Sequence, residues 1–428
     1  MNKSTPIKKA RAGRGKLALI DTKLSQPKLP RTKTPIDNAH INNGSLPKFA
    51  SVADLVERMK PSEPVHCMRP HVIEIAAKWF VSSFPGKVMY AVKTNPEPVA
   101  LKTIFNAGIK DFDVASLSEI NLVAETCEGA TMHYMHPVKS RESIMFAYNK
   151  FGIRSFSLDS MDELAKIEKM TNNADDLTLF VRLYVPNENA AYSLQGKFGI
   201  QGEAAVELLR ASRKVAKNLG VCFHVGSQCM DPNDYRMAIA KVRTLIDEAG
   251  VNVDSIDVGG GFPSIYPNLA PPALQSYMDT ISSALEQYGF DKGFDVFCEP
   301  GRAIVAENGS VVVKVELRKG NALYINDGVY GSLFDAGYPG FCYPTRALRK
   351  DGGFSGKTEP FSFFGPTCDS LDSMKGPFNL PSDIAEGDWI EIGGLGAYSK
   401  SMQSNFNGFY SDKQAELTDS PMLSMFGI

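Results

Sequence analysis

The sequence VMYAVKTNP, residues 88–96, sets a pattern that much of the chain repeats. Its first five residues are apolar and predict a buried strand, and the Thr-Asn-Pro turn starts a helix, because proline suits the first helical turn. Lys93 stands at the tip of this strand. An amine on an apolar rim is expected to be partly desolvated, which lowers its pKa and leaves more of it neutral and nucleophilic. For a lone lysine, the alternative is a side chain that extends its ammonium into water.

Strand and helix patterns alternate over about 215 residues, which is the size of a (β/α)8 barrel. The predicted strands are 88–93, 111–115, 131–136, 154–158, 177–183, 221–226, 255–259 and 295–299. The predicted helices are 97–107, 117–127, 140–150, 161–170, 202–219, 232–249 and 271–289. A doubly wound open sheet shows the same alternation and stays the alternative fold.

The pattern changes after Arg302. Residues 311–328, 360–365 and 388–393 read as strands between loops rich in glycine and proline, with little helix. Residues 46–68 are expected to add a strand to this second domain. The predicted domains are a leader (1–45), a barrel (70–308) and a β-rich domain (46–69 and 309–428).

The leader differs in composition from the rest of the chain. Residues 1–45 hold ten Lys and Arg against two Asp, a charge of +8, whereas the whole 428-residue chain has a net charge of −2. The remainder is therefore acidic, at −10, which argues against nucleic acid as the main partner. The leader has no sustained apolar period, so it is predicted to be disordered. A solvated tail without catalytic role is favoured over a transit peptide or a nucleic-acid tail.

Cysteine usage and hydropathy limit the compartment and the partners. The seven cysteines show neither zinc-type nor CxxC spacing, which predicts reduced thiols and a cytoplasmic protein. Cys127, His133 and His136 lie close in sequence but match no metal motif, so no metal is expected. No apolar run reaches the length of a membrane helix, and no membrane association is predicted.

The ends of strands seven and eight carry groups suited to a phosphate. Gly259-Gly260-Gly261 allows backbone amides to approach an anion closely, although a glycine triplet alone is more often a tight turn. Glu299-Pro300-Gly301-Arg302 supplies an acid, another glycine and a guanidinium. After strand six, His224 could stack on a ring and Ser227 could reach the phosphate, or the histidine could be a satisfied core residue. With Lys93 for a Schiff base, these groups fit pyridoxal phosphate (PLP).

At this point the chain resembles the fold-type III PLP-dependent decarboxylases of ornithine, lysine, arginine and diaminopimelate. The resemblance covers residues from about 46 to the end, and its motifs occur in family order. They are Tyr90–Asn95, Phe112–Ser116, Phe223–Ser227, Gly259–Phe262, Glu299–Arg302, Asn326–Gly331, Gly365–Asp372 and Gly396–Tyr398.

The resemblance implies a role for each residue that matches a family motif. It implies that Lys93 holds the cofactor as a Schiff base, that His224 stacks on its ring and that Glu299 pairs with the pyridine nitrogen. Other cofactor contacts are implied near the lysine, near the ring hydroxyl and around the phosphate; these residues are Asp113, Arg182, Ser227, Gly261, Pro300, Gly301, Arg302 and Tyr398.

Glu299 and the Cys-Asp motif indicate the reaction. A carboxylate keeps the ring nitrogen protonated and makes the ring a deep electron sink, whereas the alanine racemases, which share the barrel, place an arginine there. The resemblance implies that Cys368 protonates the substrate carbon after CO2 is lost. It also implies that Asp369 binds the distal ammonium, with Asp335 as a candidate second carboxylate. Two acids select a diamino acid, since an analogue without the amine would leave them unpaired.

The implied activity is decarboxylation of L-ornithine to putrescine, a step of polyamine biosynthesis, with L-lysine to cadaverine as a second reaction. The resemblance also implies a homodimer with shared active sites, and Lys197 and Asp372 match a salt bridge across that interface. The segment from Tyr330 to Asp335 is shorter than in animal enzymes, and Phe334 stands where tyrosine is common. This loop sets pocket length, so the preference between ornithine and lysine stays open. The alternatives are a diaminopimelate decarboxylase, which has glutamate at Asp369, and a non-catalytic regulatory homologue.

Overall fold

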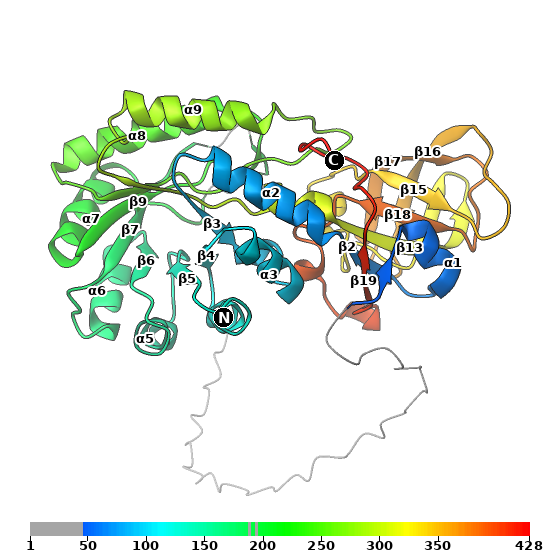
Figure 1. Ribbon diagram of the computed structural model, residues 1–428, viewed down its shortest axis with the longest axis horizontal. Helices are drawn as coiled ribbons and strands as arrows, with labels where there is room; N and C mark the ends of the chain where they lie inside the picture. The colour runs from blue at the N-terminus through cyan, green and yellow to red at the C-terminus, as the bar shows by residue number, and fades with distance from the viewer. Residues whose placement is uncertain (1–45, 187–189, 193–195) are drawn as a thin grey trace, which may run out of the picture. The chain divides into compact units, whose positions relative to one another are not determined.

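The computed structural model describes residues 46–186, 190–192 and 196–428, so the predicted leader lies outside the described residues. The described chain divides between a barrel and a twisted β-sheet that lie side by side (Figure 1). The barrel consists of eight parallel strands in the closed order β11-β12-β3-β4-β5-β6-β7-β9. The prediction of a (β/α)8 barrel is therefore confirmed over the open sheet. Its strands are β3 (Lys87–Ala91), β4 (Asp111–Val114), β5 (Thr131–Tyr134), β6 (Ser155–Leu158), β7 (Thr178–Arg182), β9 (Asn218–Cys222), β11 (Ser255–Asp257) and β12 (Asp295–Cys298).

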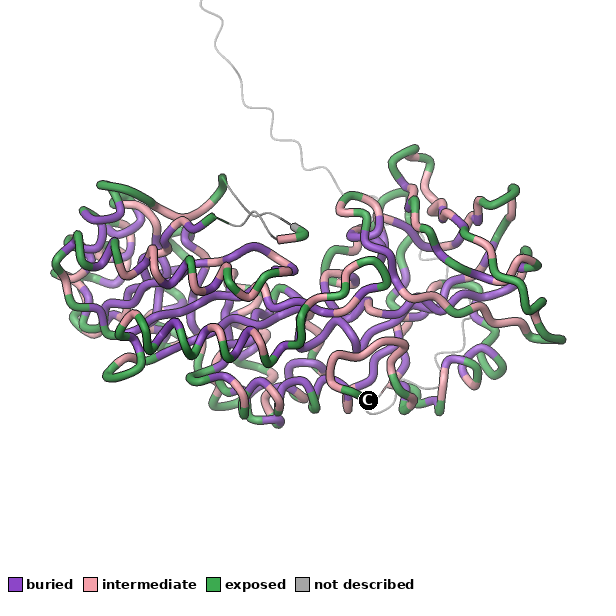
Figure 2. Tube along the Cα trace, turned by 90° about the horizontal axis from the view of Figure 1, so that it is seen from above, coloured by how far each residue is buried: buried purple, intermediate pink, exposed green. Residues whose placement is uncertain are grey.

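The barrel strands are stable because apolar side chains are buried on both of their faces. Met89, Phe180 and Phe297 pack with Met135 and Cys222 inside the barrel. Side chains of the alternate positions pack outward against the helices in the main core. The strands accordingly run as buried segments through this half of the molecule (Figure 2). Burial on both faces is the reason that β3 and β7 read as short, mostly apolar runs, whereas β4 and β6 also bury polar side chains, Asp113, Ser155 and Ser157.

Helices cover the outside of the barrel. They are α2 (Pro70–Ser83), α3 (Pro98–Asn106), α4 (Leu117–Thr126), α5 (Arg141–Asn149), α6 (Met161–Met170), α7 (Gly202–Val215), α8 (Asn233–Ala249), α9 (Leu274–Gln287) and the short α10 (Arg302–Val305). Local sequence sets several of their starts. Ser116, Ser140 and Ser160 each cap a helix by accepting a backbone N–H of its first turn. Proline occupies the first position of α2 and α3.

The second part of the fold is a nine-stranded sheet. Its strands are β1 (Lys48–Phe49), β2 (Val65–Met68), β13 (Gly309–Lys319), β14 (Ala322–Ile325), β15 (Thr345–Leu348), β16 (Thr358–Phe364), β17 (Ser373–Pro381), β18 (Trp389–Gly393) and β19 (Gln414–Leu417). The helices α1 (Val52–Met59) and α11 (Phe334–Gly337) lie in this part of the chain. Because β2 pairs with β13 and β19, the N-terminal segment belongs to this sheet.

Several predicted boundaries differ from the structure. The strand predicted at 221–226 is β9, which starts three residues earlier and ends at Cys222, because its register with β7 pairs Asn218 with Thr178. The helix predicted to reach 219 therefore ends at Val215. The strand predicted at 311–328 is interrupted at Gly320, whose φ of 59° turns the chain between β13 and β14. A short pair, β8 (Ala190–Tyr192) with β10 (Ser227–Cys229), lies outside both sheets.

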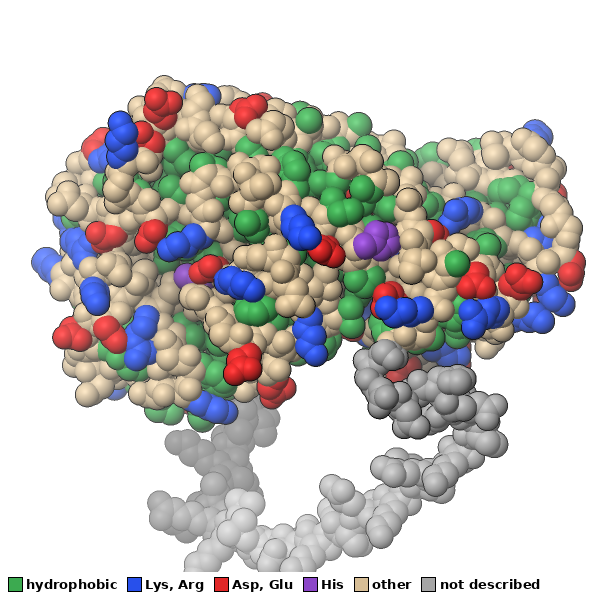
Figure 3. All heavy atoms as spheres, viewed as in Figure 1, with side chains coloured by type: hydrophobic (Ala, Val, Ile, Leu, Met, Phe, Trp, Pro, Cys, Tyr) green, Lys and Arg blue, Asp and Glu red, His purple; other side chains and the backbone are tan. Residues whose placement is uncertain are grey.

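The surface carries charges of both signs. On the face shown in Figure 3, Lys and Arg side chains are interspersed with Asp and Glu side chains, so this face has no field of a single sign. Among the described helices, none is both long enough and apolar enough to cross a membrane.

Candidate active site

The predicted site residues of the barrel meet at the carboxyl ends of its strands. Lys93 lies one residue into the 3₁₀ turn Val92–Thr94 that follows β3, so it is just beyond the strand and not part of it. Asp113 lies on β4, Arg182 ends β7, and Glu299 follows β12. The Lys93 Nζ atom is 3.4 Å from Asp113 Oδ2. Loops at this end carry the active sites of barrel enzymes, and these side chains form such a cluster.

The expectation that desolvation lowers the pKa of Lys93 is wrong. The nearby Asp113 carboxylate raises this pKa, with smaller contributions in the same direction from Tyr398 and Glu299, and together they outweigh burial and Arg182. The Lys93 side chain is 46% exposed. Without a cofactor, Lys93 is therefore an ammonium ion. It must lose a proton before it can attack an aldehyde, and the Asp113 carboxylate is within reach of that proton.

Glu299 has a neighbour that sequence reasoning missed. Burial, and then the negative charges of Asp257 and Asp113, raise the pKa of Glu299 well above its usual value. Asp257, the last residue of β11, has its pKa raised to about 6 by burial. Its Oδ1 accepts the Gly259 N–H at 2.9 Å, whereas its buried Oδ2 has no donor among the described residues. A proton on Glu299 can satisfy Oδ2, so the two carboxyls are expected to share it. An acid directly before the glycine triplet was the available signal.

The glycine triplet makes a close approach that side chains would block. A Cβ on Gly259 would lie 2.0 Å from the Phe223 carbonyl oxygen, and one on Gly261 would lie 2.4 Å from that of Gly226. Both glycines also have φ in the left-handed region, at 70° and 101°. A Cβ on Gly260 would lie 2.6 Å from the Glu299 carbonyl oxygen. These contacts pack the glycine triplet tightly against the backbone at the ends of β9 and β12, so a side chain at any of the three positions would displace the neighbouring strand ends.

Arg302 lies beside the glycine triplet, at the start of α10. Its Nη1 donates to the Tyr266 hydroxyl at 3.0 Å, and its Nη2 donates to Asp335 Oδ2 at 2.9 Å. Its Nε is buried and has no hydrogen-bond partner in the described chain. Tyr398 has a φ of 52°, and its ring centroid is 5.0 Å from the Arg302 guanidinium carbon. The guanidinium is therefore held by Tyr266 and Asp335 at its two terminal nitrogens, next to the ring of Tyr398.

His224 is held as a neutral ring. Its Nδ1 accepts the Gly226 N–H at 3.0 Å, which places the ring proton on Nε2. Burial, followed by the positive charges of Arg182 and Lys93, lowers the pKa of His224 well below its usual value. A neutral imidazole suits stacking on a cofactor ring. Three other predicted cofactor residues lie in the loops that follow barrel strands. Ser227 starts β10, and the Pro300 carbonyl accepts the Ala91 N–H at 3.4 Å. A Cβ on Gly301 would lie 2.1 Å from Thr94 Oγ1.

The Cys-Asp loop belongs to the sheet, between β16 and β17. Cys368 is exposed, and its N–H donates to Asn407 Oδ1 at 3.1 Å. Asp369 accepts the Leu371 N–H at 3.0 Å and the Tyr330 hydroxyl, and these bonds lower its pKa. These contacts hold the loop against other segments of the β-rich part of the chain, near Tyr330 and Asn407.

Four further residues predicted for the substrate site and the dimer interface make intrachain contacts. Asp335 is bound to Arg302, and Phe334 stacks on Tyr338 with ring centroids 6.5 Å apart. Asp372 is buried and accepts hydrogen bonds from Val329 N and from both donors of Thr367. Lys197 is exposed beside the Phe198 ring. The predicted salt bridge between Lys197 and Asp372 stays a prediction.

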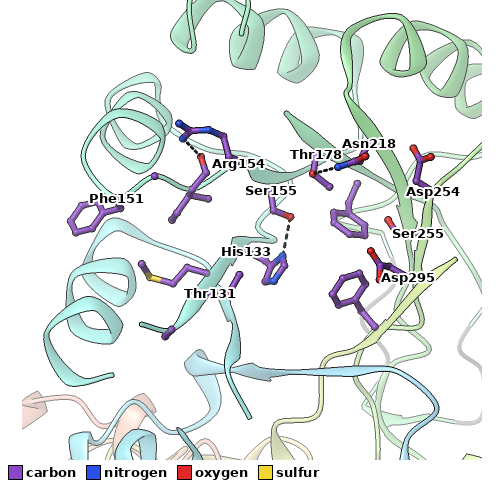
Figure 4. A pocket seen from close by; sticks show the side chains of 16 residues that line it. Thr131, His133, Phe151, Arg154, Ser155, Thr178, Asn218, Asp254, Ser255 and Asp295 are labelled. Atoms are coloured by element: carbon purple, nitrogen blue, oxygen red, sulfur yellow. Dashed lines mark hydrogen bonds between the residues drawn. The ribbon is translucent and has the colours of Figure 1, made fainter. Parts of the chain in front are cut away.

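A cavity of about 490 Å³ lies at the opposite end of the barrel, where the strands begin. Figure 4 shows its lining, which includes His133, Arg154, Asp254 and Asp295. Both ring nitrogens of His133 are bonded, Nδ1 with Ser155 at 3.0 Å and Nε2 with Asp111 at 2.9 Å. The lining contains none of the predicted cofactor or substrate residues.

The barrel and its carboxyl-end cluster define a protein that holds an anionic cofactor next to a lysine. The family described as pyridoxal-dependent decarboxylase, pyridoxal binding domain, matches residues 71–306, more than half of the chain. The chain belongs to this family of pyridoxal-dependent decarboxylases.

Relatives and solved structures agree with this assignment. The lysine/ornithine decarboxylase of Selenomonas ruminantium is 32% identical over 343 residues, covering 78% of this chain and 84% of the relative. The ornithine decarboxylase of Schizosaccharomyces pombe is 33% identical over 360 residues, covering 78% and 79%. The structure of Paramecium bursaria Chlorella virus arginine decarboxylase bound to agmatine has a TM-score of 0.76 and 25% identity, covering 86% of this chain and 99% of that one.

The residues present fit PLP. The positive charge of Arg302 beside the glycine triplet suits its phosphate, and neutral His224 suits its ring. Lys93 supplies the amine for its aldehyde, and Glu299 supplies a carboxyl for its pyridine nitrogen. When bound, PLP provides the electron sink that stabilises the charge left on the substrate by departing CO2.

Proposed function

We propose that this protein removes CO2 from L-ornithine to form putrescine, with PLP as cofactor, and that it also accepts L-lysine. The observation that carries the proposal is the placement of Lys93, Asp113 and Glu299 together at the carboxyl end of the barrel. An acid at Glu299 keeps the pyridine nitrogen protonated, which favours decarboxylation over racemisation. The relatives act on the same class of basic amino acids, as their names state.

Asp369 is the proposed site of the substrate's distal ammonium. Hydrogen bonds from Leu371 and Tyr330 lower its pKa, so it is a carboxylate at neutral pH. A carboxylate at the end of the pocket favours a diamino acid over an amino acid with an uncharged side chain. It also disfavours diaminopimelate, whose second carboxylate would meet a like charge.

The surface around the Cys-Asp loop supports a homodimer with shared sites. Tyr338 is 81% exposed and Leu371 is 73% exposed, and with Met402 they line an open apolar cavity of about 800 Å³. Exposed apolar patches of this kind commonly mark protein interfaces. In such a dimer, the exposed Cys368 would reach the barrel of the other subunit and protonate the substrate carbon. A cytoplasmic location is proposed from the seven free cysteines.

The test is a parallel assay of CO2 release from ornithine, lysine, arginine and diaminopimelate by the PLP-loaded protein, with each product amine identified. We expect putrescine from ornithine as the main product, a lower rate with lysine and no product from diaminopimelate. The Lys93→Ala variant is the control, and it is expected to lose at least about a thousandfold in rate. Release of CO2 from none of the four amino acids would refute the proposal. Absence of a pyridoxyl group on Lys93 after borohydride treatment would favour a non-catalytic homologue.

A further inference from the structure

Three segments that carry predicted cofactor residues meet at the backbone of Gly396, in the loop after β18. The Gly396 N–H donates to the Ala306 carbonyl at 2.9 Å, and its own carbonyl accepts from the Asn95 side-chain amide at 2.9 Å. A Cβ on Gly396 would lie 1.7 Å from the Val305 carbonyl oxygen, so this loop packs directly against the end of α10. The loop is therefore held on one side by α10 and on the other by the turn after β3.

Each of these segments brings its cofactor residue close to the meeting point. Lys93 stands two positions before Asn95, and Tyr398 stands two positions after Gly396. Arg302 is the first residue of α10. Because these spacings along the backbone are short, the bond between Asn95 and Gly396 fixes where the lysine and the tyrosine lie relative to each other.

The Asn95 side chain uses both of its polar groups. Its Nδ2 donates to the Gly396 carbonyl, and its Oδ1 accepts the Glu97 N–H at 3.1 Å, directly before α3 begins. The Asn95 main chain is also held, because its carbonyl accepts the Tyr90 hydroxyl at 3.1 Å. Asparagine is suited to this position because its amide is both a donor and an acceptor, whereas an ionised aspartate is an acceptor only.

Tyr398 needs such support because its backbone conformation is strained. Its φ of 52° lies in the left-handed region, which residues other than glycine rarely adopt. A strained conformation persists only where the surrounding structure holds it. The Tyr398 N–H donates to the Thr94 carbonyl at 3.0 Å, and Thr94 stands between Lys93 and Asn95. The bond from Asn95 to Gly396 therefore supports a second contact between the same turn and the same loop.

We propose that Asn95 is a positioning residue that joins the Lys93 turn to the Tyr398 loop and thereby sets the separation of lysine and tyrosine that cofactor binding requires. This inference rests on the proposed function, because the roles of Lys93 and Tyr398 are those that the family implies. Asn95 acts through Gly396 and takes no part in a chemical step.

A second connection between the same two segments provides the control. Glu97 Oε1 is 3.1 Å from Lys400 Nζ, and the two side chains are 22% and 23% exposed. This ion pair joins the segment after Lys93 to the loop beyond Tyr398. The variant Glu97→Gln therefore weakens the attachment of the loop to the barrel while the Asn95 side chain is kept.

The main test compares Asn95→Asp with Glu97→Gln. Aspartate keeps the acceptor for the Glu97 N–H but places a carboxylate oxygen against the Gly396 carbonyl oxygen. For each variant, the dissociation constant of PLP is measured by titrating the cofactor-free protein, and the free energy of unfolding is measured in urea. We expect Asn95→Asp to weaken PLP binding by about tenfold or more and Glu97→Gln by less than about threefold. At saturating PLP, the visible circular dichroism of the bound cofactor should change only in Asn95→Asp.

Two results would overturn the proposal. One is a PLP affinity of Asn95→Asp within about threefold of the wild type, which would leave Asn95 with a role in stability alone. The other is an equal weakening in both variants, which would show that any attachment of the loop has the same effect. Asn95→Ser covers the case in which Asn95→Asp does not fold, because serine keeps an acceptor near the Glu97 N–H but is too short to reach Gly396. Since PLP titration needs no turnover, this inference can fail or hold independently of which amino acid the protein decarboxylates.

Discussion

The two ends of the barrel are built from the same strands but differ in how their polar groups are satisfied. At the amino end, Asp254 pairs with Arg213 and Asp295 pairs with Lys87, around a cavity of about 490 Å³. At the carboxyl end, Asp257 is the last residue of β11 and Glu299 follows β12, and burial raises the pKa of both carboxyls.

The difference shows that cavity size does not identify the functional site. The amino end offers space, but its Asp254 and Asp295 carboxylates are already paired with Arg213 and Lys87, and Ser255 Oγ is the one buried side-chain oxygen or nitrogen without a partner among the described residues that line the cavity. At the carboxyl end, a buried Arg302 Nε and a buried Asp257 Oδ2 lack partners, and the pKa values of Lys93 and His224 are shifted by their neighbours. Unsatisfied groups and shifted pKa values indicate where a ligand completes the structure.

The largest difference between the two ends of the barrel is expected in kcat, when the residues at the two ends of β12 are substituted. Glu299→Gln removes the acid that keeps the pyridine nitrogen protonated, so kcat for ornithine should fall by roughly 10²–10³-fold. The measurement is steady-state CO2 release at saturating PLP. Asp295→Asn, at the start of the same strand, is the matched control and should leave kcat within about twofold. Equal losses of kcat in the two variants would show that the carboxyl end of β12 has no special role in catalysis.

An intermediate difference is expected in the free energy of unfolding, when the residues at the two ends of β11 are substituted, and this difference depends on pH. Burial raises the pKa of Asp257 to about 6, and that of Glu299 is raised as well. A carboxyl whose pKa is raised by folding stabilises the fold below its unfolded pKa, and this contribution is lost as the pH rises through the folded value. The free energy of unfolding of the cofactor-free protein should therefore decrease between about pH 4 and pH 6. A shift of about two units corresponds to a decrease of at most about 3 kcal/mol.

The Asp257→Asn variant tests this dependence by urea unfolding across that pH range. The substitution removes one carboxyl with a raised pKa and also the charge that raises the pKa of Glu299. The free energy of unfolding of the variant should therefore depend less on pH than that of the wild type. Asp254→Asn, at the start of β11, should keep the wild-type profile. A profile for Asp257→Asn that is as steep as the wild type would contradict the shared proton.

The smallest effect is expected inside the amino-end cavity. His133→Gln disturbs the hydrogen bonds to Asp111 and Ser155, so the free energy of unfolding should fall by about 1–2 kcal/mol. The dissociation constant of PLP and kcat should not change, because this end takes no part in cofactor binding. Denaturant unfolding and PLP titration of the same preparation provide the comparison. A weaker PLP affinity in this variant would show that the amino-end cavity influences cofactor binding at the carboxyl end.

Much of the fold could be predicted from local patterns. Short apolar or β-branched runs that alternate with helical patterns identified all eight barrel strands, although β4 and β6 also bury polar side chains. The end of β9 was placed too far along, since Phe223 and Val225 are apolar in a loop that is buried against the next strand. The strands β15, β17 and β19 were missed. β15 and β17 are partly exposed and follow loops that contain glycine and proline, and β19 is a partly exposed strand of four residues, so periodicity is weak in all three.

The candidate site was predictable where its groups follow strand ends. The positions of Lys93, His224, the glycine triplet and Glu299 follow from the order of strands in a barrel. The protonation of Lys93 was predicted wrongly, because the opposing Asp113 charge comes from the neighbouring strand and outweighs burial. The contribution of Asp257 was missed for a similar reason, since it depends on how close β11 and β12 bring two carboxyls.

The sequence by itself determined the family, the cofactor and the residues at the strand ends, because each is encoded within a few consecutive residues. The tertiary structure decided which charges face each other. Lys93 is an ammonium beside Asp113, Glu299 has a carboxyl neighbour in Asp257, and Arg302 is paired with Asp335. Electrostatic interactions depend on the distance and burial of groups on different elements, and those quantities exist only once the chain has folded.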